Sequence, residues 1–443
     1  MELLQSIVIS AAIGISSIAA GLAAFEQSQP ATEQFQKLQE ELRVARAKGD
    51  TASYLGSARR MHDFLNGSPA SVLQLMSTQA FAGELEEALD SLTQFVHMGQ
   101  SNEQVLQAKQ FDALRGMPQY AKIHAAMVSN AGATSFADKA FSLPGSEPIP
   151  EDIDYDPETK LFYVTSVLNK EIFSIDEDGR TMVFAKTLDY WPMMAVKIDA
   201  HRRILWATEV AIDGFTSSPR KDWGRSAIVM YDLKSGKLIR RVEGPAHTAL
   251  GDLTLTGDGD PIVSDGDHGG VYRVNRLTGQ IARLDAGDFI SPQTPAMLPD
   301  GLHLLVPDYL RGIGILDLGT KRVSWFPMED AHALSGIDGL YIFGRTLIAI
   351  QNGATPERVV RFELNASLSR VESESILERA TPTLGDPTHG VVVDGFFYYI
   401  ANSGWDALDE PGNCKPGVTM PRSAVMRAQL LARTDQSKPL DRK

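Results

Sequence analysis

The chain is poor in cysteine and in net positive charge, and each shortage excludes a class of protein. Cys414 is the single cysteine, so no disulfide can form within the chain, and no histidine lies near it in sequence to activate it as a nucleophile. The 42 lysine and arginine residues are outnumbered by 56 aspartate and glutamate residues, and the formal net charge is -14. A nucleic-acid-binding protein needs a basic surface, so we expect no nucleic-acid partner.

Long apolar runs are also scarce, and the one that stands out is at the N-terminus. Residues 7–24, IVISAAIGISSIAAGLAA, have the length of a signal-peptide core or a thin membrane anchor. Small residues at Ala23 and Ala24 suit a cleavage site, although the preceding MELLQS has no lysine or arginine. We predict a signal peptide over residues 1–24 and a periplasmic or secreted protein. The alternative is an uncleaved anchor, in which case the membrane is contacted through residues 7–24.

Residues 31–135 have helical periodicity and are predicted to form a separate helical domain. Gly49-Asp50, Gly67-Ser68 and Ala82-Gly83 divide this segment into paired helices. The pairs resemble tetratricopeptide-type repeats, whose period is about 34 residues. Two interpretations stay open for the segment: a small bundle that packs on the next domain, or a groove that docks a protein partner.

From residue 140 to residue 432 one strand-turn-strand pattern recurs six times. Each unit has an apolar strand, a short turn and a second strand rich in β-branched and aromatic residues, at spacings of about 40–60 residues. The turn anchors are Asp156, Asp199, Asp258, Asp300, Gly344 and Asp394. This period predicts a mainly β fold, a six-bladed β-propeller that follows the helical domain. KAFSLP (139–144) is expected to add an outer strand to the last blade and so to close the ring.

Polar residues open five of the six predicted inner strands, where a propeller brings them to one end of its axis. They are Glu151, Asp252, Gln293, Asp338 and His389. Carboxylate and amide oxygens with an imidazole make a hard cation site, of the kind Ca²⁺ prefers and Mg²⁺ or Mn²⁺ can also use. Each residue also has a structural interpretation, such as a bond to a backbone group at the start of a blade. The insertion GFTSSPRKDWGRS (214–226) is a candidate lid or wall for this site.

These residues also carry a resemblance to a known family. The stretch from about 146 to 430 resembles the SMP-30/gluconolactonase/LRE-like six-bladed propellers: PIPEDIDYDPETKLFYVTS is similar to the opening blade, which places a metal-ligating glutamate at Glu151. The resemblance implies further metal ligands at Asp252, Gln293 and Asp338, with Gly251 and Gln293 where the family has asparagine. It also implies that Asp338 acts as general base, and His389 matches the central histidine of phosphotriesterase-like members.

The function implied by the resemblance is a metal-dependent hydrolase, a Ca²⁺-dependent lactonase or esterase that acts on a small molecule in the central channel. Asp338 or His389 would activate water. The alternative is a non-catalytic binding or scaffold protein of the cell envelope, whose helical segment docks a protein partner, because a fold does not by itself fix a function.

Overall fold

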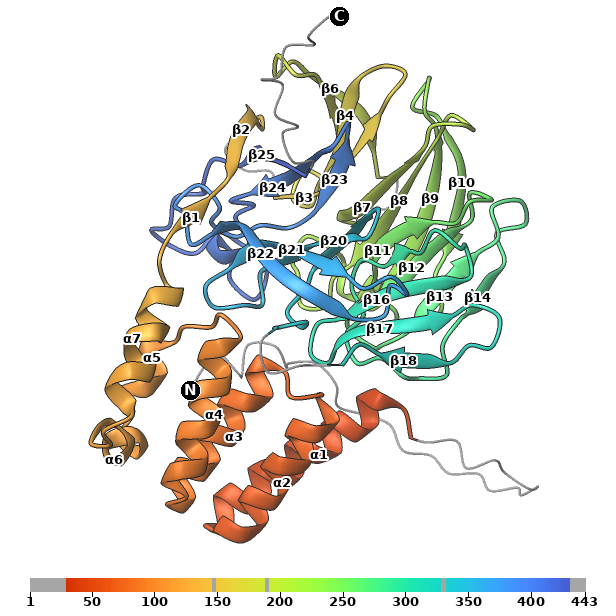
Figure 1. The fold of residues 1–443 in the computed structure, drawn as a ribbon. Coiled ribbons are helices and arrows are strands. Elements are labelled where there is room, and N and C mark those ends of the chain that lie inside the picture. Colours follow the sequence, from red (N-terminus) through yellow and green to blue (C-terminus); the bar gives the residue numbers. More distant parts are fainter. Residues whose placement is uncertain (1–28, 146–148, 188–190, 328–331, 431–443) are drawn as a thin grey trace, which may run out of the picture.

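A computed structural model describes residues 29–145, 149–187, 191–327 and 332–430, and it shows a six-bladed β-propeller with an N-terminal helical region (Figure 1). The predicted fold is therefore confirmed. The predicted signal peptide or anchor lies outside the described residues. None of the helices in the described part of the chain has the length and hydrophobicity of a bilayer-spanning segment.

The helical region consists of four longer helices followed by short ones. Its members are α1 (Ala31–Lys48), α2 (Thr51–Phe64), α3 (Pro69–Ala82), α4 (Leu85–His97), α5 (Glu103–Leu106), the 3₁₀ turn η1 (Lys109–Phe111), α6 (Asp112–Arg115) and α7 (Tyr120–Asn130). The breaks fall where the sequence predicts them. Gly49 and Gly83 end α1 and α3 with positive φ angles of 66° and 83°, a conformation that glycine adopts without strain. Asp50 caps α2 by accepting the Ser53 N–H at 3.0 Å.

Each blade is an antiparallel sheet in which the chain runs outward from the axis. Blade 1 contains β3 (Pro150–Asp156), β4 (Leu161–Ser166), β5 (Glu171–Ile175) and β6 (Thr181–Lys186). Blade 2 contains β7 (Met193–Asp199), β8 (Ile204–Ala211), β9 (Arg225–Asp232) and β10 (Leu238–Glu243). Blade 3 contains β11 (Leu250–Leu255), β12 (Pro261–Asp265), β13 (Val271–Val274) and β14 (Ile281–Arg283).

The remaining blades repeat the arrangement. Blade 4 contains β15 (Ala296–Met297), β16 (His303–Asp308), β17 (Gly312–Asp317) and β18 (Val323–Trp325). Blade 5 contains β19 (Gly339–Phe343), β20 (Thr346–Gln351), β21 (Arg358–Leu364) and β22 (Val371–Arg379). Blade 6 contains β23 (Gly390–Val393), β24 (Phe396–Ala401) and β25 (Ala424–Gln429). The first strands of neighbouring blades lie next to one another around the axis.

The N-terminal side of the propeller closes the ring, as the sequence predicts. Strand β2 (Ala137–Ser142) pairs with β25 and becomes the outermost strand of blade 6, while β1 (Thr134–Ser135) pairs with β22 at the edge of blade 5. Two edges that would otherwise expose unpaired backbone groups are therefore covered. The helices end at Asn130, before this pairing begins. The domain boundaries 31–135 and 140–432 stay predictions.

The helical region packs on the rim of blades 4 and 5, at the end of the axis where the inner strands begin. The Ser101 N–H donates to the Thr355 carbonyl at 2.6 Å. The Arg311 guanidinium lies between the rings of Phe64 and Trp325, at 4.7 and 4.3 Å from their centroids, and its Nε donates to the Phe64 carbonyl. An arginine held in this way by two rings and a carbonyl joins the two parts of the chain. Docking of a partner through these helices stays a prediction.

Removal of the Phe141 ring tests the role of the closing strand. Phe141 is 7% exposed and lies 5.1 Å from the Phe162 ring in the core between blades 6 and 1. Phe141→Ala should lower the free energy of unfolding by about 3 kcal/mol, because it leaves a cavity in this core. Urea unfolding of the full chain measures the change. The control is Phe136→Ala. The Phe136 ring is nearby in sequence and 73% exposed, so its removal should change the free energy of unfolding by less than about 0.5 kcal/mol. Equal effects of the two variants would contradict the closure.

Candidate metal centre at the propeller axis

The inner strands bring polar residues from four blades to one end of the axis. Glu151 is the second residue of β3, Asp252 is the third residue of β11, and Asp338 and His389 directly precede β19 and β23. Because the chain enters each blade from the same end, the first residues of the inner strands converge there. The four side chains are far apart in sequence, and the closed ring makes them neighbours.

Hydroxyl groups of the second strands hold the starts of the inner strands in place. Thr208 Oγ1 of β8 donates to the Gly251 carbonyl of blade 3 at 2.8 Å, and Ser264 Oγ of β12 donates to the Gln293 carbonyl of blade 4 at 2.9 Å. Thr165 of β4 makes the equivalent bond to the Met194 carbonyl of blade 2. Each bond joins one blade to the residue that opens the next, and so fixes the geometry of the ring.

Glu151, Asp338 and His389 form a compact group of candidate metal ligands. One ligand atom from each residue lies within 4.8 Å of the other two. Asp252 lies beside this group, because its Oδ1 is 2.8 Å from His389 Nε2. His389 is 2% exposed, and Glu151 and Asp252 are 8% and 7% exposed. Asp338 is only partly buried, so these three residues are shielded from solvent while Asp338 is partly exposed to it.

His389 has a hydrogen-bond partner at each ring nitrogen. Nδ1 lies 2.9 Å from the Glu151 backbone carbonyl, which can only accept, and Nε2 faces the Asp252 carboxylate. Burial alone would lower the pKa of His389, but the negative charges of Asp338 and Asp252 and the bond to Asp252 raise it well above its ordinary value. We therefore assign an imidazolium that donates from both nitrogens.

The surroundings of two of the carboxyl groups raise their pKa values toward neutral pH. Burial raises the pKa of Glu151 to about 8 and that of Asp338 to about 7. The charge of Asp338 adds to the shift at Glu151, and the charge of Asp252 adds to the shift at Asp338, while His389 opposes both shifts. A divalent cation in this group would favour the ionised carboxylates, so the donor set fits a metal ion on charge as well as on ligand type.

Three polar groups outside the predicted ligand set orient the carboxylates; the sequence indicates Asn352 only as a strand-end residue that more often caps a blade loop, and it does not indicate Thr294 or Trp405. Trp405 Nε1 donates to Glu151 Oε2 at 2.5 Å, Asn352 Nδ2 donates to Asp338 Oδ2 at 2.8 Å, and Thr294 Oγ1 donates to Asp252 Oδ1 at 2.6 Å. Asn352 ends a predicted strand and Thr294 directly precedes one, so their positions in the repeat could have indicated them as site residues. Trp405 lies in a loop outside the repeat, so no spacing pointed to it.

The amide nitrogen of Gln293 is bonded within its own loop. Its amide nitrogen donates to Ser291 Oγ at 3.0 Å and to the Ser291 carbonyl at 3.3 Å. In this orientation the side chain belongs to the loop before β15. Its role as a ligand stays a prediction, and the described contacts give it a structural role.

Two loops meet over blade 1 at the mouth of the channel. The loop that joins β8 to β9 includes the insertion predicted as a lid or wall, with the 3₁₀ turn η2 (Arg220–Asp222), and the loop that joins β24 to β25 includes η3 (Trp405–Ala407). The Thr216 N–H donates to the Pro411 carbonyl at 2.9 Å, and the rings of Phe215 and Trp405 have centroids 6.0 Å apart. The predicted wall therefore packs against the loop that holds Glu151.

No family model and no curated protein matches the chain. Among solved structures, it is similar to a PQQ-bound aldose sugar dehydrogenase from Streptomyces coelicolor, at 13% identity and a TM-score of 0.46, covering 67% of this chain and 98% of the other. A gluconolactonase from Xanthomonas campestris gives 14% identity, a TM-score of 0.44 and coverage of 68% and 97%. A virginiamycin B lyase from Staphylococcus aureus gives 16% identity, a TM-score of 0.42 and coverage of 59% and 80%. These identities are too low to transfer a function.

Nitrogen NMR of the histidine rings tests the assignment of His389. In protein freed of metal by a chelator, at pH 7, both ring nitrogens of His389 should be protonated, because each one faces an acceptor and the surrounding carboxylates favour the charged ring. His389→Gln removes one of the nine histidine signals and so identifies it. A ring with one unprotonated nitrogen at this pH would contradict the assignment.

Proposed function

We propose that the chain binds a divalent cation, with Ca²⁺ the first candidate, and hydrolyses a small lactone or ester at the propeller axis. The observation that carries the proposal is the convergence of Glu151, Asp338 and His389, with ligand atoms within 4.8 Å of one another, in a buried carboxylate-rich setting. Membership of the SMP-30/gluconolactonase family is part of this proposal. It rests on the matched positions in the sequence.

The side chains divide into holding and reacting groups. Glu151 and Asp252 would hold the cation, with Asp338 and His389 beside them. Hydrogen bonds from Trp405 and Thr294 fix the orientation of the Glu151 and Asp252 carboxylates. When bound, the cation would supply Lewis-acid polarisation of the substrate carbonyl and stabilisation of the oxyanion. The carboxyl groups at the axis have few positive charges near them, so a bound cation would stabilise their ionised forms. Their raised pKa values agree with this need for positive charge.

Asp338 is the group best placed to act as general base. Without a metal ion its pKa is about 7, and a bound cation would lower the pKa and so keep the carboxylate ionised and able to accept a proton. Asn352 donates to Oδ2, so Oδ1 would take the proton from a water molecule as its oxygen attacks the carbonyl carbon. The carbon–oxygen bond of the ester or lactone then breaks, and the leaving alkoxide takes back the proton that Asp338 accepted from the water molecule.

A second candidate is a metal-free binding protein, and one observation favours it. His389 already places a positive charge between Asp252 and the Glu151 carbonyl, so the ring has a counter-charge of its own. In that case the propeller would bind a small molecule without turnover. The helical region, if it is tetratricopeptide-like, would dock a protein partner in the cell envelope.

Hydrolysis assays with and without metal separate the two candidates. The purified chain should hydrolyse a panel of lactones and aryl esters only with Ca²⁺ or another divalent ion, and a chelator should abolish the activity. Asp338→Asn should lower kcat/KM by about 100-fold or more, as expected for loss of a general base. Asp258→Asn, which changes an exposed turn residue at the opposite end of blade 3, is the matched control. Metal-independent turnover, or full activity of Asp338→Asn, would contradict the proposal.

A further inference from the structure

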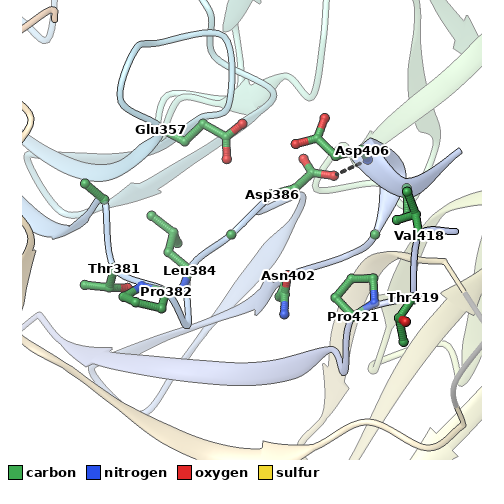
Figure 2. A pocket seen from close by; sticks show the side chains of 14 residues that line it. Glu357, Thr381, Pro382, Leu384, Asp386, Asn402, Asp406, Val418, Thr419 and Pro421 are labelled. Atoms are coloured by element: carbon green, nitrogen blue, oxygen red, sulfur yellow. Dashed lines mark hydrogen bonds between the residues drawn. The ribbon is translucent and has the colours of Figure 1, made fainter. Parts of the chain in front are cut away.

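Beside the axis, between blades 5 and 6, lies a cavity of about 570 Å³ that the central site does not use (Figure 2). It opens at the same end of the propeller as the metal centre, because it is lined by loops that follow β20, β22 and β24. Its wall is mixed. Leu384 and Pro382 lie on one side and Val418 lies across from them beside Asp406, while Glu357, Asp386 and Asp406 bring three carboxylates to the edge between them.

The cavity shares its walls with the candidate metal centre. Trp405, which donates to Glu151, lies between Gly404 and Asp406, and both of these neighbours line the cavity. On the other side, Asn352 Nδ2 donates to Asp338 Oδ2 at 2.8 Å and to the Pro387 carbonyl at 3.2 Å. Pro387 directly follows Asp386 of the cavity wall. The cavity and the metal centre are therefore neighbours, and both open at the same end of the propeller.

The carboxylates of the cavity have no cationic side chain beside them in its lining. None of the described residues that line it is lysine, arginine or histidine. Lys415 is near, but its Nζ donates to the Asp406 backbone carbonyl at 2.8 Å. Within the described chain, the Glu357 carboxylate has no hydrogen-bond partner, and Asp386 Oδ2 accepts from Ser403 Oγ at 2.9 Å.

Burial and mutual repulsion act together on these carboxyl groups. Burial, with the charges of Asp386 and Asp406, raises the pKa of Glu357 to about 8. Burial also raises the pKa of Asp386 to about 6, with a contribution from Asp406 and opposition from the bond to Ser403. A bound cation would offset this repulsion, and the apolar side of the cavity would contact a hydrocarbon group.

We infer that this cavity binds the non-reacting part of the substrate, and that this part is an apolar group bearing a protonated amine. The ammonium group would face Glu357 and Asp386, the hydrocarbon would lie against Leu384 and Pro382, and the ester or lactone would extend past Asn352 toward Asp338. The catalytic meaning of the inference rests on the proposed function. The binding itself does not depend on a metal ion or on turnover.

Direct titration with a matched set of small probes tests the inference. Cyclohexylamine, cyclohexanol and cyclohexanecarboxylate have the same ring and differ in charge, and NMR titration of the full chain at pH 7.5 follows each one. The amine should bind at least about tenfold more tightly than the alcohol, since a charged hydrogen bond separates them. Glu357→Gln should weaken amine binding by about tenfold, and because the Glu357 carboxylate makes no described hydrogen bond while its backbone carbonyl keeps its bond from the Ala380 N–H, folding should be unaffected. The control is Glu177→Gln, an exposed glutamate between β5 and β6, at the other end of the propeller.

The outcomes separate this inference from the proposed function. Amine binding that persists in Asp338→Asn while that variant loses hydrolysis supports both. Amine binding in a chain that hydrolyses nothing supports the cavity alone. Equal binding of amine and alcohol, unchanged binding in Glu357→Gln, or displacement of the amine by Ca²⁺ in Asp338→Asn would overturn the assignment of the cavity to an ammonium group.

Discussion

The convergence of buried carboxylates at the axis is the constraint on which the site depends. A closed ring of six blades places Glu151, Asp252 and Asp338 together whether or not their charges are compatible. Burial away from water raises the pKa values of Glu151 and Asp338, and repulsion among the like charges adds to the rise. Positive charge must enter this group as protons, as the His389 imidazolium or as a metal ion. The chemistry of the site follows from which of these is present.

The rest of the molecule controls how a ligand reaches this group. The helical region occupies the rim over blades 4 and 5, and the loops from blades 2 and 6 meet over blade 1. Trp405 belongs to one of these loops and also donates to Glu151, so the same loop covers the channel and orients a carboxylate of the site. The cavity between blades 5 and 6 opens at the same end, where neither the helices nor the blade 2 insertion reaches the lining residues.

The sequence predicts the fold and the location of the site because both follow from the repeat. Strand and turn patterns are local, and a period of about 40–60 residues translates directly into blades and into residues that share a ring. The orientation of a side chain is not local. Gln293 occupies a ring position, but Ser291 holds its amide, and Trp405 reaches Glu151 from a loop with no counterpart in the other blades. Loop contacts of this kind form between distant segments, and no periodicity encodes them.

We propose that the carboxylates and the imidazole at the axis exchange protons for a divalent cation. Calorimetric titration of the metal-free chain with Ca²⁺ or Mn²⁺ at pH 7, in two buffers of different ionisation enthalpy, measures this exchange directly. Binding should release at least about one proton per ion, because Glu151 and His389 are protonated at this pH and a bound cation favours the loss of these protons. Release should fall in His389→Gln. Binding without proton release, or no binding by either ion, would contradict the claim.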